Sequence, residues 1–164
     1  MHEEALESAA RAVELMPDLA EAHFNRAAAL ARRRRFVDAE AAFRKVLALQ
    51  PDNAAALTEL GQVVAELKRF DEAIGIMRRA VELQPDKIGA YLPLAATLVM
   101  AMELDASEAA WRKAIDLAPN SARAWAGLGT TMRVVGRFDE ARGRILSGRW
   151  RWILICPTLM AAWR

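Results

Sequence analysis

Four prolines recur at a constant interval along the chain, and this spacing limits the fold more than any other feature. The interval is 34 residues, and the prolines are Pro17, Pro51, Pro85 and Pro119. Proline cannot continue a helix, and a short polar residue after it satisfies free backbone N–H groups at the next helix start. The pattern therefore predicts a helix stop before each proline. It also predicts N-caps at the four residues that follow: Asp18, Asp52, Asp86 and Asn120.

Small and apolar residues repeat in the same phase. The expected turn within each period carries Phe36, Phe70, Leu104 and Phe138, and three residues later come Ala39, Ala73, Ser107 and Ala141. Small side chains at that point suit two helices that cross closely. Bulky fillers of the second helix are Phe43, Met77, Trp111 and Ile145. Because good helix formers dominate and Asn-Gly hairpin signals are absent, we predict an all-α fold of helix–turn–helix units.

This pattern resembles the tetratricopeptide repeat family, which has a 34-residue unit with the signature W-x2-L-G-x2-Y, then A-x3-F, then P. The stretch from Ala54 to Lys87 matches it with Leu57, Leu60, Gly61, Val64, Ala73, Met77, Ala80 and Pro85. The last period matches it with Trp125, Leu128, Gly129, Met132, Ala141 and Ile145. The resemblance covers nearly the whole chain and implies a right-handed α–α superhelix, or solenoid, of stacked units.

The repeat phase divides residues 1–164 as one tetratricopeptide domain. Residues 1–17 carry only the second helix of a repeat, which is interpreted either as a capping helix or as part of a longer solenoid. Complete repeats are expected at 20–53, 54–87 and 88–121, a fourth at 122–148, and a divergent tail at 149–164. In the tail, proline comes at Pro157, four residues later than the period predicts; we interpret this as a lengthened last helix or as aberrant sequence.

Three residues depart from the family pattern. Arg26 stands where the family has Leu, and His23 where it has a large apolar residue, so the first repeat is a looser match. Pro93 falls within the first two turns of a predicted helix, where it shifts or bends the helix start rather than breaking the helix.

No catalytic constellation is present. His2 and His23 have no partner at metal-ligand spacing, Cys156 has no local catalytic signature, and phosphate-binding glycine motifs are absent. Carboxylates such as Glu66 and Glu72 are expected at caps and solvated faces. We therefore predict a non-enzymatic protein with no catalytic, cofactor-binding or metal-binding residues and no small-molecule substrate.

The resemblance implies that the first helices of the repeats line a concave groove. Such a groove binds an extended peptide or a partner helix. The predicted lining of the groove is Phe24, Asn25, Arg32, Glu59, Gln62, Glu66, Leu92, Val99, Met100, Arg123, Thr130 and Arg133. The leading hypothesis is thus a protein-interaction scaffold.

Two alternatives stay open. The first alternative to a scaffold is the helical module of a larger enzyme that resembles glycosyl- or sulfotransferases. The weaker alternative is a nucleic-acid-binding solenoid. Basic residues concentrate at the C-terminal end, since residues 121–164 carry 8 Lys and Arg against 2 Asp and Glu. The short run from Arg32 to Arg35 is explained by the favourable placement of cations at a helix C-terminus.

Location and assembly follow from the chain ends and the lone cysteine. The acidic N-terminus lacks the apolar core of a secretory signal, and no apolar run approaches the roughly 18 residues of a membrane span. A single cysteine fits a reducing compartment, so we expect a cytoplasmic protein. Apolar residues of the tail provide a contact for homo-oligomers, and the residues concerned are Trp150, Trp152, Ile153 and Leu154.

Overall fold

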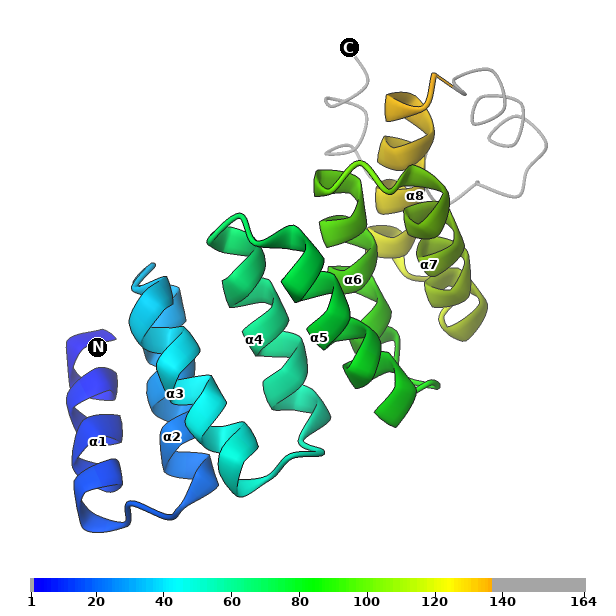
Figure 1. Ribbon diagram of the computed structural model, residues 1–164. Coiled ribbons are helices and arrows are strands. Elements are labelled where there is room, and N and C mark those ends of the chain that lie inside the picture. Colours follow the sequence, from blue (N-terminus) through cyan, green and yellow to red (C-terminus); the bar gives the residue numbers. More distant parts are fainter. Residues whose placement is uncertain (1, 137–164) are drawn as a thin grey trace. The chain divides into compact units, whose positions relative to one another are not determined.

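The computed structural model describes residues 2–136, and it falls into two compact units, residues 1–85 (unit 1) and 86–164 (unit 2). Unit 1 contains α1 (His2–Leu15), α2 (Ala20–Arg32), α3 (Phe36–Leu49), α4 (Ala54–Glu66) and α5 (Phe70–Leu83). The described part of unit 2 contains α6 (Ile88–Met100), α7 (Leu104–Leu117) and α8 (Ala122–Val134) (Figure 1). Every regular element of the described residues is a helix, which confirms the predicted all-α fold of helix–turn–helix units. The single-domain assignment stays a prediction.

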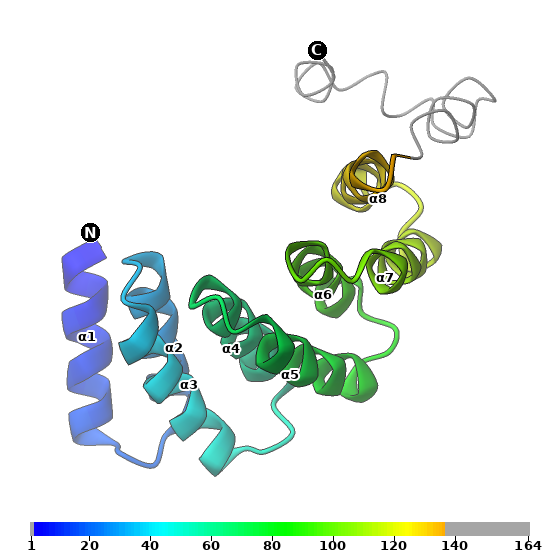
Figure 2. The ribbon, with the colours of Figure 1, turned by 45° about the horizontal axis from the view of Figure 1, so that its top comes forward.

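Consecutive helices pair within each unit. In unit 1, α2 pairs with α3 and α4 with α5, while α1 packs on α2 and α3 packs on α4. In unit 2, α7 packs on both α6 and α8 (Figure 2). We call α2, α4, α6 and α8 the first helices and α1, α3, α5 and α7 the second helices. Within the units, the second helices α3 and α7 each pack on two neighbouring helices, as expected for repeats that cannot bury their apolar faces alone.

The core of unit 1 is built from the repeat columns. Phe43 and Val46 of α3 and Leu60 and Val64 of α4 are at most 3% exposed. The small column lies where helices cross, and both Ala39 and Ala73 are fully buried. These burials confirm the predicted roles of the columns.

The core of unit 2 is built from the same repeat columns, but two columns carry a different residue type from unit 1. Its small column carries Ser107, which is fully buried, and its bulky column carries Trp111, which is 4% exposed. The Ser107 hydroxyl donates to the carbonyl of Ala95 at 2.9 Å and lies 3.2 Å from the hydroxyl of Thr131. A buried hydroxyl is tolerated because it is hydrogen-bonded, and here it joins α6, α7 and α8.

The turns within the hairpins share one backbone geometry. Arg34, Lys68 and Met102 each follow a first helix by two residues, and each has a positive φ between 59° and 65°. In each turn the next residue donates its N–H back to the last helical turn, as Arg35 does to the Leu30 carbonyl at 3.0 Å. This is the helix-ending motif in which glycine is the usual choice, and Gly136 occupies the same position with φ of 76°. The equal spacing of these residues explains why the turn is the same in every repeat.

The predicted N-caps are wrong by one residue. The caps of α2, α4, α6 and α8 are Leu19, Asn53, Lys87 and Ser121, and each of them follows the polar residue that we expected. Only Asn53 and Ser121 among them accept a side-chain bond, from the N–H of Ala56 and of Ala124. Four residues separate the helices, and the proline and the following Asp or Asn form the turn in the middle of them.

Pro93 does not interrupt α6. The helix runs from Ile88 to Met100 with Pro93 buried inside it, as the prediction of a tolerated proline requires. Proline has no N–H to give to the carbonyl four residues earlier, which belongs to Gly89. Gly89 lies next to the helix start and is exposed, so water can satisfy that carbonyl.

Candidate functional site

The first helix of every hairpin keeps one stripe of residues at least partly open to solvent. The predicted groove residues all lie on these helices: three on α2, three on α4, three on α6 and three on α8. Their side chains are half-buried or exposed, without exception among the twelve. Solvated side chains on the same face of successive helices are what a binding surface requires, and we call this stripe the first-helix face.

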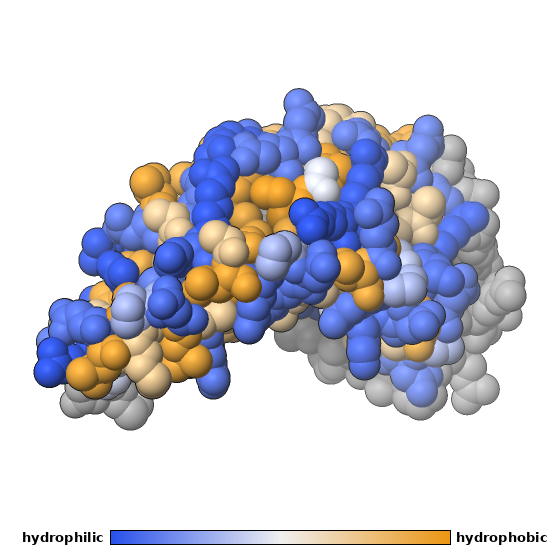
Figure 3. All heavy atoms as spheres, turned by 60° about the horizontal axis from the view of Figure 1, so that its bottom comes forward, coloured by the Kyte–Doolittle hydropathy of each residue, from blue (hydrophilic) through white to orange (hydrophobic). Residues whose placement is uncertain are grey.

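In unit 1 the first-helix face is mixed and mainly polar. α2 contributes Asn25 and Arg32, which are exposed, and α4 contributes Glu59 and Gln62, which are half-buried. α2 also contributes the half-buried Phe24, and Figure 3 shows that, on one side of the molecule, hydrophobic side chains reach the surface among hydrophilic ones. Such a surface offers both hydrogen-bonding groups and apolar contact area.

Phe24 is more than a surface residue. Its ring packs edge-on against Phe43, with 5.5 Å between ring centroids and 78° between ring planes. Phe24 is half-buried and belongs to the rim of the unit 1 core. The predicted groove residue is therefore held in a fixed orientation by the core beneath it.

In unit 2 the first-helix face changes character. α6 presents Leu92 and Val99, which are half-buried, and Met100, which is 44% exposed. α8 presents Arg123, Thr130 and Arg133, all exposed. The Thr130 hydroxyl donates to the carbonyl of Ala126 at 3.0 Å, within its own helix.

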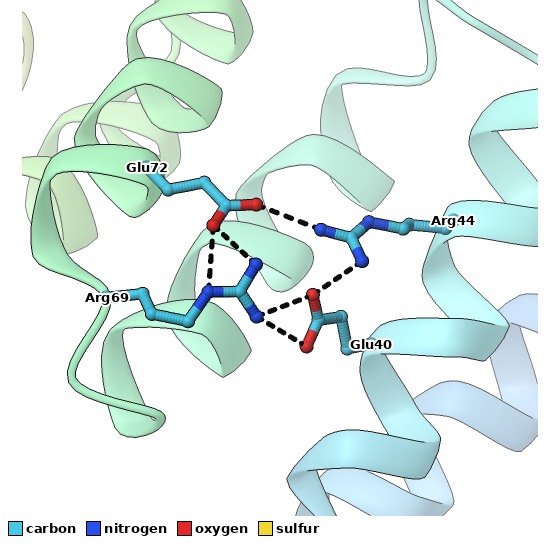
Figure 4. Close-up of polar contacts among 4 residues, drawn as sticks. All are labelled: Glu40, Arg44, Arg69 and Glu72. Atoms are coloured by element: carbon cyan, nitrogen blue, oxygen red, sulfur yellow. Dashed lines mark hydrogen bonds and ion pairs between the residues drawn. The ribbon is translucent and has the colours of Figure 1, made fainter.

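Four charged residues connect the first two complete repeats of unit 1 (Figure 4). Glu40 on α3 is 6% exposed and accepts from Nη1 of Arg69 at 2.9 and 3.0 Å. Arg44 lies one turn further along α3, with Nη1 2.7 Å from Glu40 and Nη2 2.9 Å from Glu72 on α5. Arg69 also donates from Nε to Glu72 at 2.8 Å. The two arginines and two carboxylates thus form a closed ring.

The ring is a structural lock rather than a reactive centre. Its buried carboxylate is neutralised by two guanidinium groups, and each guanidinium meets both carboxylates. The hydrogen bonds that Arg69 donates to Glu40, and next to Glu72, raise the pKa of Arg69 above its ordinary value. A raised pKa means that this contribution to stability is present below the ordinary pKa of arginine. It is lost only as the pH rises through the raised value, so it is constant from neutral to strongly alkaline pH.

The sequence interpretation missed this lock. Glu72 was expected to be a solvated carboxylate, but it is half-buried between Arg44 and Arg69. The available signal was a column: Glu40 stands 34 residues before Ile74, which is a core residue with 2% exposure. Glu108 stands 34 residues after Ile74, is 8% exposed, and pairs with Arg112 as Glu40 pairs with Arg44. A glutamate at a repeat position that is otherwise apolar, with an arginine four residues later, indicates a buried glutamate paired with that arginine.

Removing the buried carboxylate of the lock should cost less stability than removing its two arginines. Glu40→Leu places an apolar side chain where the next repeat has Ile74, and the released arginines, about half exposed, regain water. We expect this variant to unfold within roughly 1 kcal/mol of the wild type. Arg44→Met combined with Arg69→Met instead leaves the buried Glu40 carboxylate without a cation, and we expect a clearly larger loss. Urea denaturation followed by far-UV circular dichroism measures both, and the reverse order of stability would contradict the interpretation.

In α2 and in α8, one polar side chain is hydrogen-bonded to the turn that precedes the helix. His23 Nε2 lies 2.8 Å from the carbonyl of Pro17, and Trp125 Nε1 donates to the carbonyl of Pro119 at 2.7 Å. Both residues occupy the same repeat position, so the imidazole of His23 makes the same contact with a proline carbonyl as the indole N–H of Trp125. His23 is 7% exposed and faces the turn, so it is buried at the position where the family has a large apolar residue. Arg26, by contrast, is exposed where Leu60, Leu94 and Leu128 are buried.

The described residues contain no group of three or more His, Cys, Asp or Glu side chains that could hold a metal ion. None of the described helices is long and apolar enough to span a membrane. The predicted oligomer contact of Trp150, Trp152, Ile153 and Leu154 lies outside the described residues. So do the later members of the repeat columns, which are Phe138, Ala141 and Ile145.

The folded residues define an all-α protein of stacked helical hairpins with a 34-residue period. A family model for the tetratricopeptide repeat matches residues 2–54, 34–88 and 98–147. These matches span most of the chain, and the chain therefore belongs to the tetratricopeptide repeat family. No curated protein matches the chain in sequence.

Solved structures agree with this assignment. The chain is similar to a fragment of MamA from Desulfovibrio magneticus RS-1, with a TM-score of 0.84 and 22% identity over 95% of this chain and 88% of that one. It is also similar to YrrB, described as a tetratricopeptide repeat protein with an unusual peptide-binding site. That match has a TM-score of 0.72 and 24% identity over 95% of this chain and 78% of that one. At these identities the likeness establishes the fold.

A third similarity involves part of an enzyme. An O-GlcNAc transferase mutant from Thermobaculum terrenum matches with a TM-score of 0.65 and 28% identity. The match covers 69% of this chain but only 22% of the transferase chain. The likeness therefore concerns a helical portion of that protein and not the whole of it.

Proposed function

We propose that this protein is a non-enzymatic interaction module that binds a peptide segment of another protein on its first-helix faces. The observation that carries the proposal is the stripe of half-buried and exposed residues on one side of each of the four first helices. The first helices pack on their neighbours through their buried sides, and the half-buried and exposed residues of the stripe lie on the remaining side. The first helices are left to present side chains to a ligand.

The chemistry of the faces supports a peptide as the ligand. Amides and carboxylates of unit 1, such as Asn25, Glu59 and Gln62, suit backbone and side-chain hydrogen bonds. The apolar residues of α6 suit a hydrophobic anchor, which usually carries most of the binding energy in such interfaces. The similarity to YrrB, a protein described as having a peptide-binding site, favours the same class of ligand.

A peptide array probed with the full chain tests the proposal, followed by fluorescence anisotropy with the peptides that bind. Two face variants, Gln62→Arg with Glu59→Arg in unit 1 and Val99→Arg in unit 2, place bulky charges on the two faces. We expect at least one of them to lower the affinity about ten-fold or more, which corresponds to roughly 1.4 kcal/mol.

The matched controls are Lys45→Glu on α3 and Lys113→Glu on α7, which change exposed residues of second helices. These controls are expected to bind as the wild type does. An array without any ligand, or an equal loss in face and control variants, would contradict binding on the first helices.

A second candidate function is a helical module of a larger glycosyltransferase-like enzyme that presents a partner or substrate. The similarity to part of the O-GlcNAc transferase chain favours it. Mapping the native reading frame tests it: a catalytic domain continuous with this chain supports the module. A frame that ends near Arg164 without such a domain rejects it.

A further inference from the structure

The two first helices of unit 2 carry positive charge and no negative charge. α6 contains no charged residue, and α8 contains only Arg123 and Arg133. Among the residues that the structure describes, Arg123 has no carboxylate partner, and its side chain is exposed. The face of unit 2 therefore combines an apolar helix with a cationic one.

The two helices lie against each other in matched register. α6 contacts α8 directly, and both pack on α7. Residues 34 apart occupy equal repeat positions, which pairs Leu92 with Ala126 and Val99 with Arg133. One side of the face is thus an apolar stripe, and the adjacent side carries a cation near each end of α8.

Two exposed methionines lie at the end of α6 and in the turn after it. Met100 is 44% exposed at the end of α6, and Met102 is 68% exposed in the turn that follows. Flexible and polarisable methionine side chains are well suited to surfaces that adapt to an apolar ligand. Exposed side chains of this size gain free energy when a partner covers them.

From these features we infer that unit 2 binds an acidic peptide segment with an apolar anchor, seated on α6 and flanked by Arg123 and Arg133. The inference rests on the proposed peptide-binding function and specifies the ligand. The anchor removes Leu92, Val99 and Met100 from water, while carboxylates of the segment meet the two guanidinium groups. Carboxylate–guanidinium pairs are strong and directional, so they fix the register of the bound segment.

Charge also argues against the chain's own C-terminal residues as the occupant. Residues 137–164 carry six Arg and two acidic residues, so their net charge has the same sign as that of the face. Like charges across an interface are unfavourable, and they discourage the same segment of a second copy as well. A partner with acidic residues meets no such repulsion from the arginines of α8.

Three labelled peptides of equal length test the inference by fluorescence anisotropy with the full chain. The first has two apolar residues flanked by Glu, the second replaces each Glu with Lys, and the third replaces the apolar pair with Ala. We expect the first to bind at least ten-fold more tightly than either of the others. Raising the salt concentration should weaken it, because exposed charges are screened.

Variants then place the peptide on unit 2. Arg123→Glu combined with Arg133→Glu should lower the affinity for the acidic peptide at least ten-fold and raise the affinity for the Lys peptide. The control Lys45→Glu with Lys113→Glu changes the net charge by the same amount on second helices, and it should leave both affinities unchanged. Circular dichroism spectra that match the wild type show that the variants remain folded.

Four results would overturn the inference. The first is equal binding of the acidic and Lys peptides, and the second is an acidic-peptide affinity that survives the double Arg variant. The third is competition by an anionic oligonucleotide with an affinity equal to that of the peptide, because a polyanion needs no apolar anchor. The fourth is a dimer in light scattering that the Arg variants dissociate, which would make a second copy the occupant.

The result also separates this inference from the proposed function. If the acidic peptide does not bind, but a basic or neutral peptide binds and is lost with Val99→Arg, the chain is a peptide binder and the ligand class inferred for unit 2 is wrong. If none of the three peptides and no array peptide binds, the proposed function itself fails.

Discussion

Phe43→Ala is expected to lower the free energy of unfolding of unit 1 by about 3–5 kcal/mol, the usual cost of removing a buried aromatic ring. Phe43 is fully buried at the centre of the unit 1 core, between the helices of one hairpin and the next. Close-packed neighbours refill such a space only in part, so a cavity remains. The loss is a large share of the stability that small repeat units possess.

Urea denaturation followed by far-UV circular dichroism measures this loss. Unit 1 contains no tryptophan, since all five lie after residue 85, so tryptophan fluorescence separately reports unit 2. The control is Val37→Ala on the same helix, where the side chain is 69% exposed and the change is expected to stay within about 0.5 kcal/mol. A loss below 1 kcal/mol for Phe43→Ala would show that its ring is not the centre of the core.

The same substitution links stability to binding. Phe24 loses the ring against which it packs edge-on, and it is a residue of the first-helix face. A ligand that contacts Phe24 then meets a less ordered surface and must pay for ordering it. A peptide bound on unit 1 should therefore bind more weakly to Phe43→Ala even under conditions in which the variant is folded.

Gly127→Ala is expected to destabilise unit 2 by roughly 1–3 kcal/mol, although alanine favours helix formation more than glycine does. A Cβ atom at this position would lie 2.3 Å from the ring of Trp111 and 2.5 Å from two further ring atoms. The indole is rigid and only 4% exposed, so it moves only if the surrounding core moves with it. The glycine is thus required by the close approach of α8 to the tryptophan of α7.

The matched control is Gly75→Ala in α5. This glycine is exposed, and a Cβ atom there meets nothing within 4 Å. The control should gain about 0.5–1 kcal/mol from helix propensity alone. The two glycines are therefore expected to respond to the same substitution with opposite signs, as measured by urea denaturation.

A rescue experiment identifies the clash as the cause. Combining Gly127→Ala with Trp111→Leu should cost less than the sum of the two single changes, because the smaller side chain makes room for the methyl group. Trp111→Leu also removes the indole N–H, which is buried without a hydrogen-bond partner among the described residues. Additive losses would show that Gly127 matters for another reason.

Much of the fold follows from the sequence because repetition multiplies weak signals. A single Pro17 or Ala39 says little, but the same residue type at four equal intervals predicts helix ends, turns and the close crossing point. The twelve predicted face residues follow from the same phase, and all twelve lie on first helices with solvated side chains. Whether they bind a peptide is a prediction that the fold alone does not test.

The cap positions show the limit of this reasoning. Asp52 was predicted to cap α4, but Asn53 does so, because Pro51 and Asp52 both lie in the turn between the helices. Both residues are good caps, and local preference alone cannot choose between neighbours. Only the geometry of the connection to α3 decides the register.

The 34-residue proline interval, with the columns that repeat in its phase, was enough to determine the helix ends before each proline, the core columns and the family, since these depend on local propensity and on a period. The tertiary structure decided what happens between helices. It buried Glu40 between two arginines, turned Phe24 from a surface residue into part of the core rim, and set Gly127 against Trp111. Such contacts join residues from different helices, and their distances depend on how the helices pack, which no periodicity along the chain encodes.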